Sequence, residues 1–190
     1  FQLNLGNYDL VKIVENVVFS IREYIEQKDR KFEFTSEVEE KVLSCDPFNI
    51  ERVLLNLLSN AIKFTEKGDR IKVQLVDLKQ QVRIIIKDSG IGIPKSKQNL
   101  IFKRFGQVDK SLTRNNEGSG MGLSIVKLIV NAHGGKIKVD SEVGVGSEFI
   151  IDLPVTKLQD KANDASYFKY SSQELGERIN MEFADIYNHE

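Results

Sequence analysis

The chain has 190 residues, of which 41% are hydrophobic and 29% are charged, and its formal net charge is −1. This composition is typical of a soluble globular domain, and it gives no support to a nucleic-acid partner, which a basic surface would attract. No apolar run approaches the roughly 20 residues of a membrane-spanning helix, so we expect this chain itself not to be inserted in a membrane, although a longer parent protein could be anchored in one. A lone cysteine, Cys45, leaves no partner for an internal disulfide and favours a reducing, cytoplasmic compartment.

Apolar periodicity divides the first half of the chain into short strands and two long helices. Helical spacing extends over 9–28 and 46–68, and each of these segments opens with an aspartate in the N-cap position. Alternation of apolar residues predicts strands over 1–8, 32–34 and 42–45.

The second half adds more strands and one more long helix. The predicted elements are antiparallel strands over 71–75 and 82–86, a helix over 122–132 and a closing hairpin over 137–153. Residues 89–119 have few periodic apolar positions, which indicates a long functional loop around a short helix near 96–105. Together the elements predict an α/β fold, a two-layer sandwich with a mixed, mostly antiparallel sheet and helices packed on one face.

A polar tail, 157–190, follows the domain that we place at 1–156. Near its end Ile179, Met181 and Phe183 alternate, as in a short strand that could add to an exposed sheet edge. A surface helix is the alternative, and the sequence does not separate the two.

Three polar side chains share one face of the helix predicted over 46–68. Asn56, Asn60 and Lys63 are separated by four and three residues, which brings them to one side of an α-helix. Neutral amide oxygens suit Mg²⁺, which keeps several waters and also binds substrate phosphates. The alternative is a solvated polar face without a ligand.

A second motif, Asp88-Ser-Gly90-Ile-Gly92-Ile93-Pro94, begins where an apolar strand ends. A carboxylate at this point can accept a hydrogen bond from an exocyclic amine such as that of adenine. Glycines allow the backbone to approach a base closely and to adopt positive φ. An ordinary β-turn is the alternative.

Two further motifs lie between this one and the predicted helix at 122–132. Phe102 and Phe105 flank Arg104, and taken alone such a pair would be assigned to the core. The segment Gly118-Ser-Gly120-Met121-Gly122-Leu123 opens the helix, so bare backbone N–H groups and the helix dipole can bind an anion there. Its glycine spacing differs from that of dinucleotide-binding proteins, and a flexible polar loop is the alternative.

In this order and spacing the four motifs resemble those of the ATP-binding catalytic domain of sensor histidine kinases. This group is the protein-histidine branch of the gyrase, chaperone and mismatch-repair ATPase superfamily. The resemblance covers roughly residues 1–156. It implies a Bergerat-type sandwich with a long ATP lid, and ATP and Mg²⁺ as cofactors.

The resemblance also implies roles for individual residues. Asn60 would hold Mg²⁺ and Asp88 would read the adenine amine. Asn56, Lys63 and Arg104 would be catalytic, Arg104 by reaching the γ-phosphate. The implied nucleotide contacts are Asn60, Lys63, Phe64, Asp88, Gly90, Gly92, Ile93, Phe102, Phe105, Gly118, Gly120, Met121, Gly122 and Leu123.

Asn56 bears on the type of reaction. Superfamily members that hydrolyse ATP carry a glutamate at this position as general base, and an amide cannot take that role. We therefore expect phosphoryl transfer rather than hydrolysis. Neither His133 nor His189 lies in a segment that resembles a phosphoacceptor, so the acceptor histidine is expected on a separate dimerisation domain of the parent kinase.

The resulting expectation is a protein-histidine kinase of two-component signal transduction, with a response regulator as its further partner. The alternatives are a superfamily ATPase, or a nucleotide-dependent serine kinase or interaction module.

Overall fold

A five-stranded sheet forms one layer of the molecule. The computed structural model describes residues 1–103, 122–159, 174–181 and 183. In the sheet the strands follow the order β2 (Lys31–Ser36), β4 (Arg70–Asp77), β5 (Gln81–Asp88), β7 (Gly146–Pro154) and β6 (Lys136–Glu142). Strands β2 and β4 run parallel, and every other neighbouring pair is antiparallel. The mixed, mostly antiparallel sheet predicted from the sequence is confirmed.

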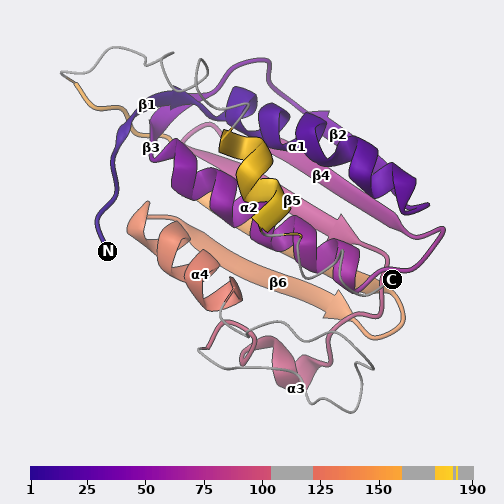
Figure 1. The fold of residues 1–190 in the computed structure, drawn as a ribbon. Coiled ribbons are helices and arrows are strands. Elements are labelled where there is room, and N and C mark those ends of the chain that lie inside the picture. The colour runs from indigo at the N-terminus through magenta and orange to yellow at the C-terminus, as the bar shows by residue number, and fades with distance from the viewer. Residues whose placement is uncertain (104–121, 160–173, 182, 184–190) are drawn as a thin grey trace.

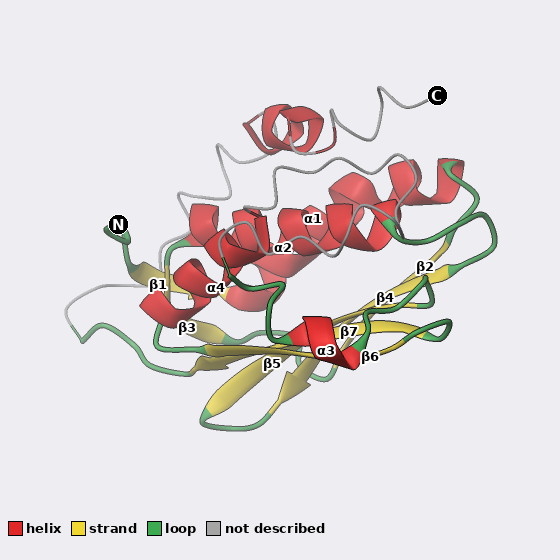
Figure 2. Ribbon diagram, turned by 90° about the horizontal axis from the view of Figure 1, so that it is seen from below, coloured by secondary structure: helices red, strands yellow, loops and turns green. Residues whose placement is uncertain are grey.

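A smaller ribbon and the helices complete the fold. Strands β1 (Gly6–Asp9) and β3 (Val42–Cys45) form an antiparallel pair at one end. Helices α1 (Leu10–Gln27), α2 (Pro47–Lys63) and α4 (Gly122–Ala132) lie together on one face of the sheet, as Figures 1 and 2 show. This is the predicted two-layer arrangement.

The two long helices begin where the aspartates predicted them to begin. Asp9 accepts a hydrogen bond from the N–H of Val11, and Asp46 accepts one from the N–H of Asn49. Pro47 follows Asp46 at the first helical position, where its missing N–H costs nothing. The apolar faces of both helices are buried against the sheet, whose strands β4 and β5 alternate buried and more exposed residues.

The short helix expected near 96–105 is displaced toward the N-terminus. Helix α3 spans Lys95–Gln98, and the residues after it up to Lys103 form turns. Pro94 fixes the start of this helix because its ring presets φ at the N-cap. The rest of the predicted loop, residues 104–121, lies outside the described residues.

The C-terminal segment is helical rather than extended. Residues 174–181 and 183, here called the C-terminal helix, lie on the outer side of the helical layer, as Figure 2 shows. The strand considered for this segment is therefore wrong, and the surface helix is confirmed. Leu175, Ile179 and Phe183 are buried at a spacing of four, whereas Met181 is 80% exposed, so the buried face follows helical and not strand periodicity.

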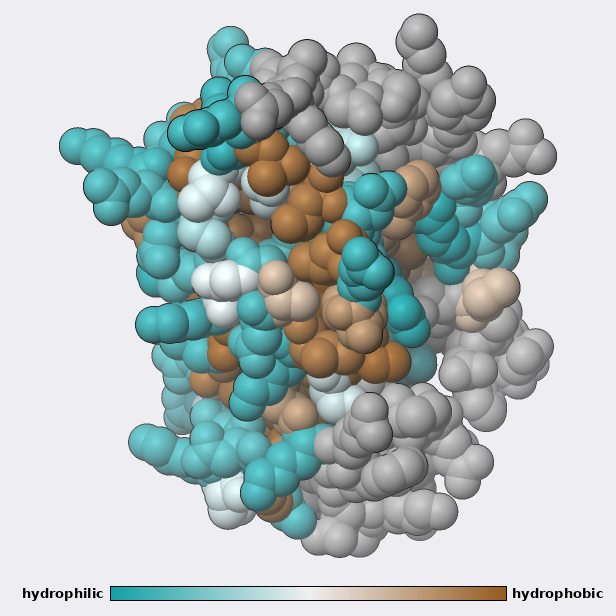
Figure 3. Space-filling view, turned by 90° about the vertical axis from the view of Figure 1, so that its left-hand side faces the viewer, coloured by the Kyte–Doolittle hydropathy of each residue, from teal (hydrophilic) through white to brown (hydrophobic). Residues whose placement is uncertain are grey.

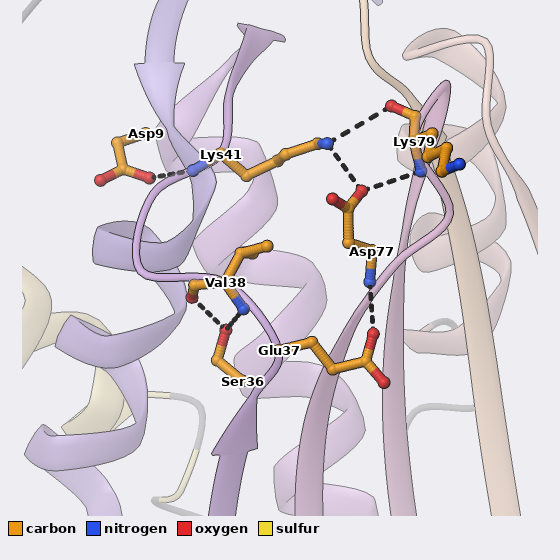
Figure 4. A network of polar contacts seen from close by, with 7 residues as sticks. All are labelled: Asp9, Ser36, Glu37, Val38, Lys41, Asp77 and Lys79. Carbon is orange, nitrogen blue, oxygen red and sulfur yellow. Dashed lines mark hydrogen bonds and ion pairs between the residues drawn. The ribbon is translucent and has the colours of Figure 1, made fainter.

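A polar network closes the end of the sheet where β4 turns into β5 (Figure 4). The ammonium of Lys41 donates to Asp77 Oδ1 at 2.6 Å and to the carbonyl of Lys79 at 3.3 Å. The backbone N–H of Lys41 donates to Asp9 Oδ1, and that of Asp77 donates to Glu37 Oε2. This network ties α1 to the sheet at the end of β5 opposite Asp88.

Apolar residues gather at the centre of the face shown in Figure 3, which is the end of the molecule that carries β1 and β3. Charged and polar residues border them. The helices described here include none with both the length and the apolar character needed to cross a bilayer.

Candidate functional site

The amide and lysine side chains predicted for the site lie on the last three turns of α2. Leu57, Leu58 and Ala61 on this helix are buried, while Asn56, Asn60, Lys63 and the next residue, Phe64, are partly exposed. The core thus fixes the orientation of α2, and the polar side chains point away from it.

Asn56 lies against the first residue of α4. A Cβ atom added to Gly122 would lie 2.6 Å from both the nitrogen and the oxygen of the Asn56 amide. Glycine at this position therefore allows α4 to begin directly beside the asparagine. Sequence reasoning gave Gly122 a role only in anion binding, because a contact between positions 66 residues apart leaves no local signal.

Asp88 is the last residue of β5, and its side chain is buried. Its Oδ1 accepts a hydrogen bond of 2.9 Å from the N–H of Gly90. Burial raises the pKa of Asp88 to about 6, and the negative charge of Asp69 adds to the shift, while backbone hydrogen bonds from Gly90 and Ser147 oppose it. A buried carboxyl held in this way is suited to selecting one hydrogen-bonding ligand group.

The turn after Asp88 packs against the end of α2. The N–H of Ile91 donates to the carbonyl of Phe64 at 3.1 Å, and a Cβ on Gly90 would lie 2.0 Å from that carbonyl oxygen. Only glycine fits there without moving the backbone. The close approach places Phe64, the C-cap of α2, beside the Asp88 turn.

The same turn is also held from the side of β6. Gly92 has φ +72°, and a Cβ on it would lie 2.0 Å from the carbonyl oxygen of Glu142. The N–H of Ile93 donates to Ser141 Oγ at 2.7 Å, and Gly144 donates to the carbonyl of Ile91. Residues 88–93 are thus fixed between α2 and the β6–β7 hairpin, which makes this turn a rigid wall of the site.

Phe102 and Leu123 are partly buried side chains packed against the core. The ring of Phe102 meets that of Phe149 edge to face at 6.3 Å, and the ammonium of Lys127 lies 5.7 Å from its centre. Their predicted nucleotide contacts stay predictions. Five other predicted site residues lie outside the described residues: Arg104, Phe105, Gly118, Gly120 and Met121.

His133 follows the last residue of α4, at the end of that helix opposite Gly122. Its Nε2 accepts a 3.0 Å hydrogen bond from the backbone N–H of Asp46, so its Nδ1 carries the proton and donates to the carbonyl of Ile129 at 2.8 Å. Burial lowers its pKa, which keeps the ring neutral. The imidazole thus joins the end of α4 to the start of α2.

Within the described ranges, no three His, Cys, Asp or Glu side chains are grouped so as to hold a metal ion. A divalent cation at this site would therefore depend on amide oxygens, water and a bound ligand.

Comparison with known proteins agrees with the fold and with the motifs. Residues 45–157 match the family described as histidine kinase-, DNA gyrase B-, and HSP90-like ATPase. The circadian input-output histidine kinase CikA of Synechococcus elongatus is 40% identical over 117 residues, 62% of this chain and 16% of its own length. The hybrid signal transduction histidine kinase D of Dictyostelium discoideum is 36% identical over 168 residues, 84% of this chain and 11% of its own length.

Among solved structures, the nucleotide-free catalytic domain of the histidine kinase ThkA superposes with a TM-score of 0.71 and 30% identity, covering 81% of this chain and 99% of that domain. ThkA has also been solved in complex with the response regulator protein TrrA, and that kinase has a TM-score of 0.67 and 29% identity, covering 80% of this chain and 42% of its own. The chain spans less than a fifth of the two curated relatives. It belongs to the family of histidine kinase-, DNA gyrase B- and HSP90-like ATPases, as the ATP-binding catalytic domain of a sensor histidine kinase.

Proposed function

We propose that this chain binds Mg-ATP and transfers its γ-phosphoryl group to a histidine on a separate dimerisation domain of the parent kinase. A response regulator would then receive the signal, as the complex of ThkA with TrrA suggests. The observation that carries the proposal is the buried carboxyl of Asp88 at the end of β5, on the wall that the turn 88–93 forms beside α2.

Asp88 would select the base. One carboxylate oxygen is bonded to the N–H of Gly90, and the group as a whole can still accept from the exocyclic amine of adenine. Guanine presents a carbonyl at the corresponding position of its ring, so two acceptors would face each other. The site should therefore discriminate strongly between the two bases.

Asn60 and Lys63 would hold the phosphate end of the nucleotide. Both are partly exposed on the same face of α2, and Asn56 lies one turn before Asn60. The amide of Asn60 fits Mg²⁺, which would supply positive charge where negative charge gathers on the transferred group. Lys63 adds a point charge, and the start of α4 at Gly122 adds backbone N–H groups.

Transfer to a protein acceptor is favoured over hydrolysis because the position of a general base holds an amide. Asn56 lies against Gly122, so it is fixed in place but cannot remove a proton from water. A neutral imidazole nitrogen needs no base to attack the γ-phosphorus. The new phosphorus–nitrogen bond forms as the bond to the β–γ bridging oxygen breaks, and ADP leaves.

The substitution Asp88→Asn tests the site. The amide would place N–H donors opposite the adenine amine, so we expect ATP affinity to fall at least about a hundredfold, as expected for a buried polar mismatch. Calorimetric titration with ATP and GTP, with and without Mg²⁺, measures the effect. Asp140→Asn, an exposed position on β6, is the matched control. Unchanged ATP affinity in the Asp88 variant would rule out the proposed adenine contact.

The acceptor is tested separately with a helical-hairpin domain that carries a histidine. Labelled phosphate from ATP should appear on that domain in an acid-labile, alkali-stable form, as phosphohistidine does. Acid-stable label would instead indicate a serine kinase, and release of free phosphate would indicate an ATPase.

A further inference from the structure

The C-terminal helix is amphipathic and packs through one face. Leu175, Ile179 and Phe183 are spaced by four residues and are buried, whereas Glu177 and Asn180 are exposed on the remaining surface. The ring of Phe183 meets Tyr24 of α1 edge to face, with ring centres 5.4 Å apart. Three apolar side chains thus attach this helix to the helical layer.

A charged contact fixes the position of the helix along α2. The guanidinium of Arg178 pairs with the fully buried carboxylate of Glu51 and also contacts Glu174 at 3.1 Å. It stacks over the ring of Phe48 at 4.5 Å. Burial raises the pKa of Glu51 to about 7, and the positive charge of Arg178 opposes this shift. A buried carboxylate needs such a cation, so this contact selects both the helix and its register.

The helix is an addition to the catalytic fold. The family match ends at residue 157, and 99% of the ThkA catalytic domain corresponds to 81% of this chain. Figures 1 and 2 show the C-terminal helix over α2, on the side of the helical layer that faces away from the sheet. The sandwich is therefore complete without it, and the surface beneath it is a separate binding face.

We propose that the outer face of α1 and α2, centred on Tyr24, Phe48 and Glu51, is a docking site for an amphipathic helix that carries a cation, and that the C-terminal helix of this chain occupies it in cis. The docking site recognises two features of the helix that occupies it. These are apolar residues at a spacing of four and an arginine directly before the second of these apolar residues. None of the residues of this docking site is proposed to bind the nucleotide, so the docking proposal does not depend on the proposed phosphoryl transfer.

The first experiment releases the helix within the full chain. Ile179→Asp places a charge on the buried face, and Asn180→Asp adds the same charge on the exposed face as the matched control. Hydrogen exchange followed by mass spectrometry should show residues 174–183 protected in the wild type and the control, and exchanging at the unfolded rate in the Ile179 variant. An unchanged melting temperature of the sandwich shows that the body stays folded.

The second experiment fills the vacated site with a labelled peptide of residues 170–190. The peptide should bind the Ile179→Asp chain one to one, and at least about tenfold more tightly than the wild type, where the tethered helix competes at high effective concentration. Arg178→Gln in the peptide should weaken binding at least about tenfold. That penalty should shrink when the chain also carries Glu51→Gln, since the two side chains act as a pair.

Three outcomes would overturn the proposal. The peptide could fail to bind a folded Ile179→Asp chain, or it could bind the wild type equally well. Alternatively, protection of residues 174–183 could depend on protein concentration, which would mean that the helix of a second copy occupies the face.

Discussion

Asp88 combines burial with a proposed function, adenine recognition, that needs its charge. Burial raises its pKa to about 6, so a substantial fraction of the side chain is protonated in mildly acidic solution. The amine of adenine is a hydrogen-bond donor, and it binds the ionised carboxylate more strongly than the neutral acid. Nucleotide binding and ionisation of Asp88 should therefore be coupled.

We expect ATP affinity to be constant above about pH 7 and to fall as the pH decreases through 6, by up to about tenfold per pH unit. Calorimetric titration between pH 5 and 8 measures this dependence. Adenosine, which has no group that titrates in this range, is the control ligand because the phosphates of ATP titrate nearby. An adenosine affinity that does not change over this range would contradict the coupling.

At the scale of elements, α2 and α4 approach each other closely where Gly122 lies against Asn56. A Cβ on Gly122 would lie 2.6 Å from the Asn56 amide, so Gly122→Ala must displace that side chain or separate the helices. We expect the substitution to cost about 1–3 kcal/mol of unfolding free energy, as overpacking does, and to weaken ATP binding.

Gly176→Ala is the matched control for this change. Nothing lies within 4 Å of a Cβ at Gly176, and alanine inside a helix is favoured over glycine by about 0.5–1 kcal/mol. Urea denaturation and calorimetry compare the two variants. Wild-type stability and ATP affinity in the Gly122 variant would mean that the spacing of the helices is set elsewhere.

The sequence correctly predicts those elements in which the apolar residues follow a single periodicity and form the buried face. Helices α1, α2 and α4 and the antiparallel strands have one apolar face each, and the aspartate caps fixed where two of the helices begin. The C-terminal segment fits two periods at once: Ile179, Met181 and Phe183 alternate, but Leu175, Ile179 and Phe183 repeat every four residues. The contact of Arg178 with Glu51, 127 residues away, favours the helix, and no local pattern records it.

Sequence patterns likewise predict the local features of the candidate site, but not the long-range contacts between elements. The motifs predicted the strand end at Asp88 and the polar face of α2, because both are local features. The contacts of Gly122 with Asn56 and of His133 with Asp46 join segments far apart in the sequence, so only the fold reveals them.

At the scale of the whole molecule, buried titratable groups make stability depend on pH in opposite directions. Burial raises the pKa of Asp88 to about 6 and that of Glu51 to about 7, so their contribution to stability is present in acid and is lost as the pH rises through these values. Burial lowers the pKa of His133, so as the pH falls the imidazole is protonated in the unfolded chain before it is protonated in the folded chain. Its contribution is present above its unfolded pKa and is lost as the pH falls.

The substitution His133→Leu, which removes both ring nitrogens, isolates the contribution of the histidine from those of the two carboxyls. At pH 8 it should lower the unfolding free energy by about 1–3 kcal/mol, because the buried N–H of Asp46 loses the acceptor that the imidazole provides. Urea denaturation of both proteins at several pH values gives the difference between them, in which the contributions of Asp88 and Glu51 cancel. That difference should shrink toward pH 5, since only the wild type loses the contribution of its neutral imidazole. A difference that grows as the pH falls would mean that His133 is charged in the folded chain, in which case its Nε2 could not accept from Asp46.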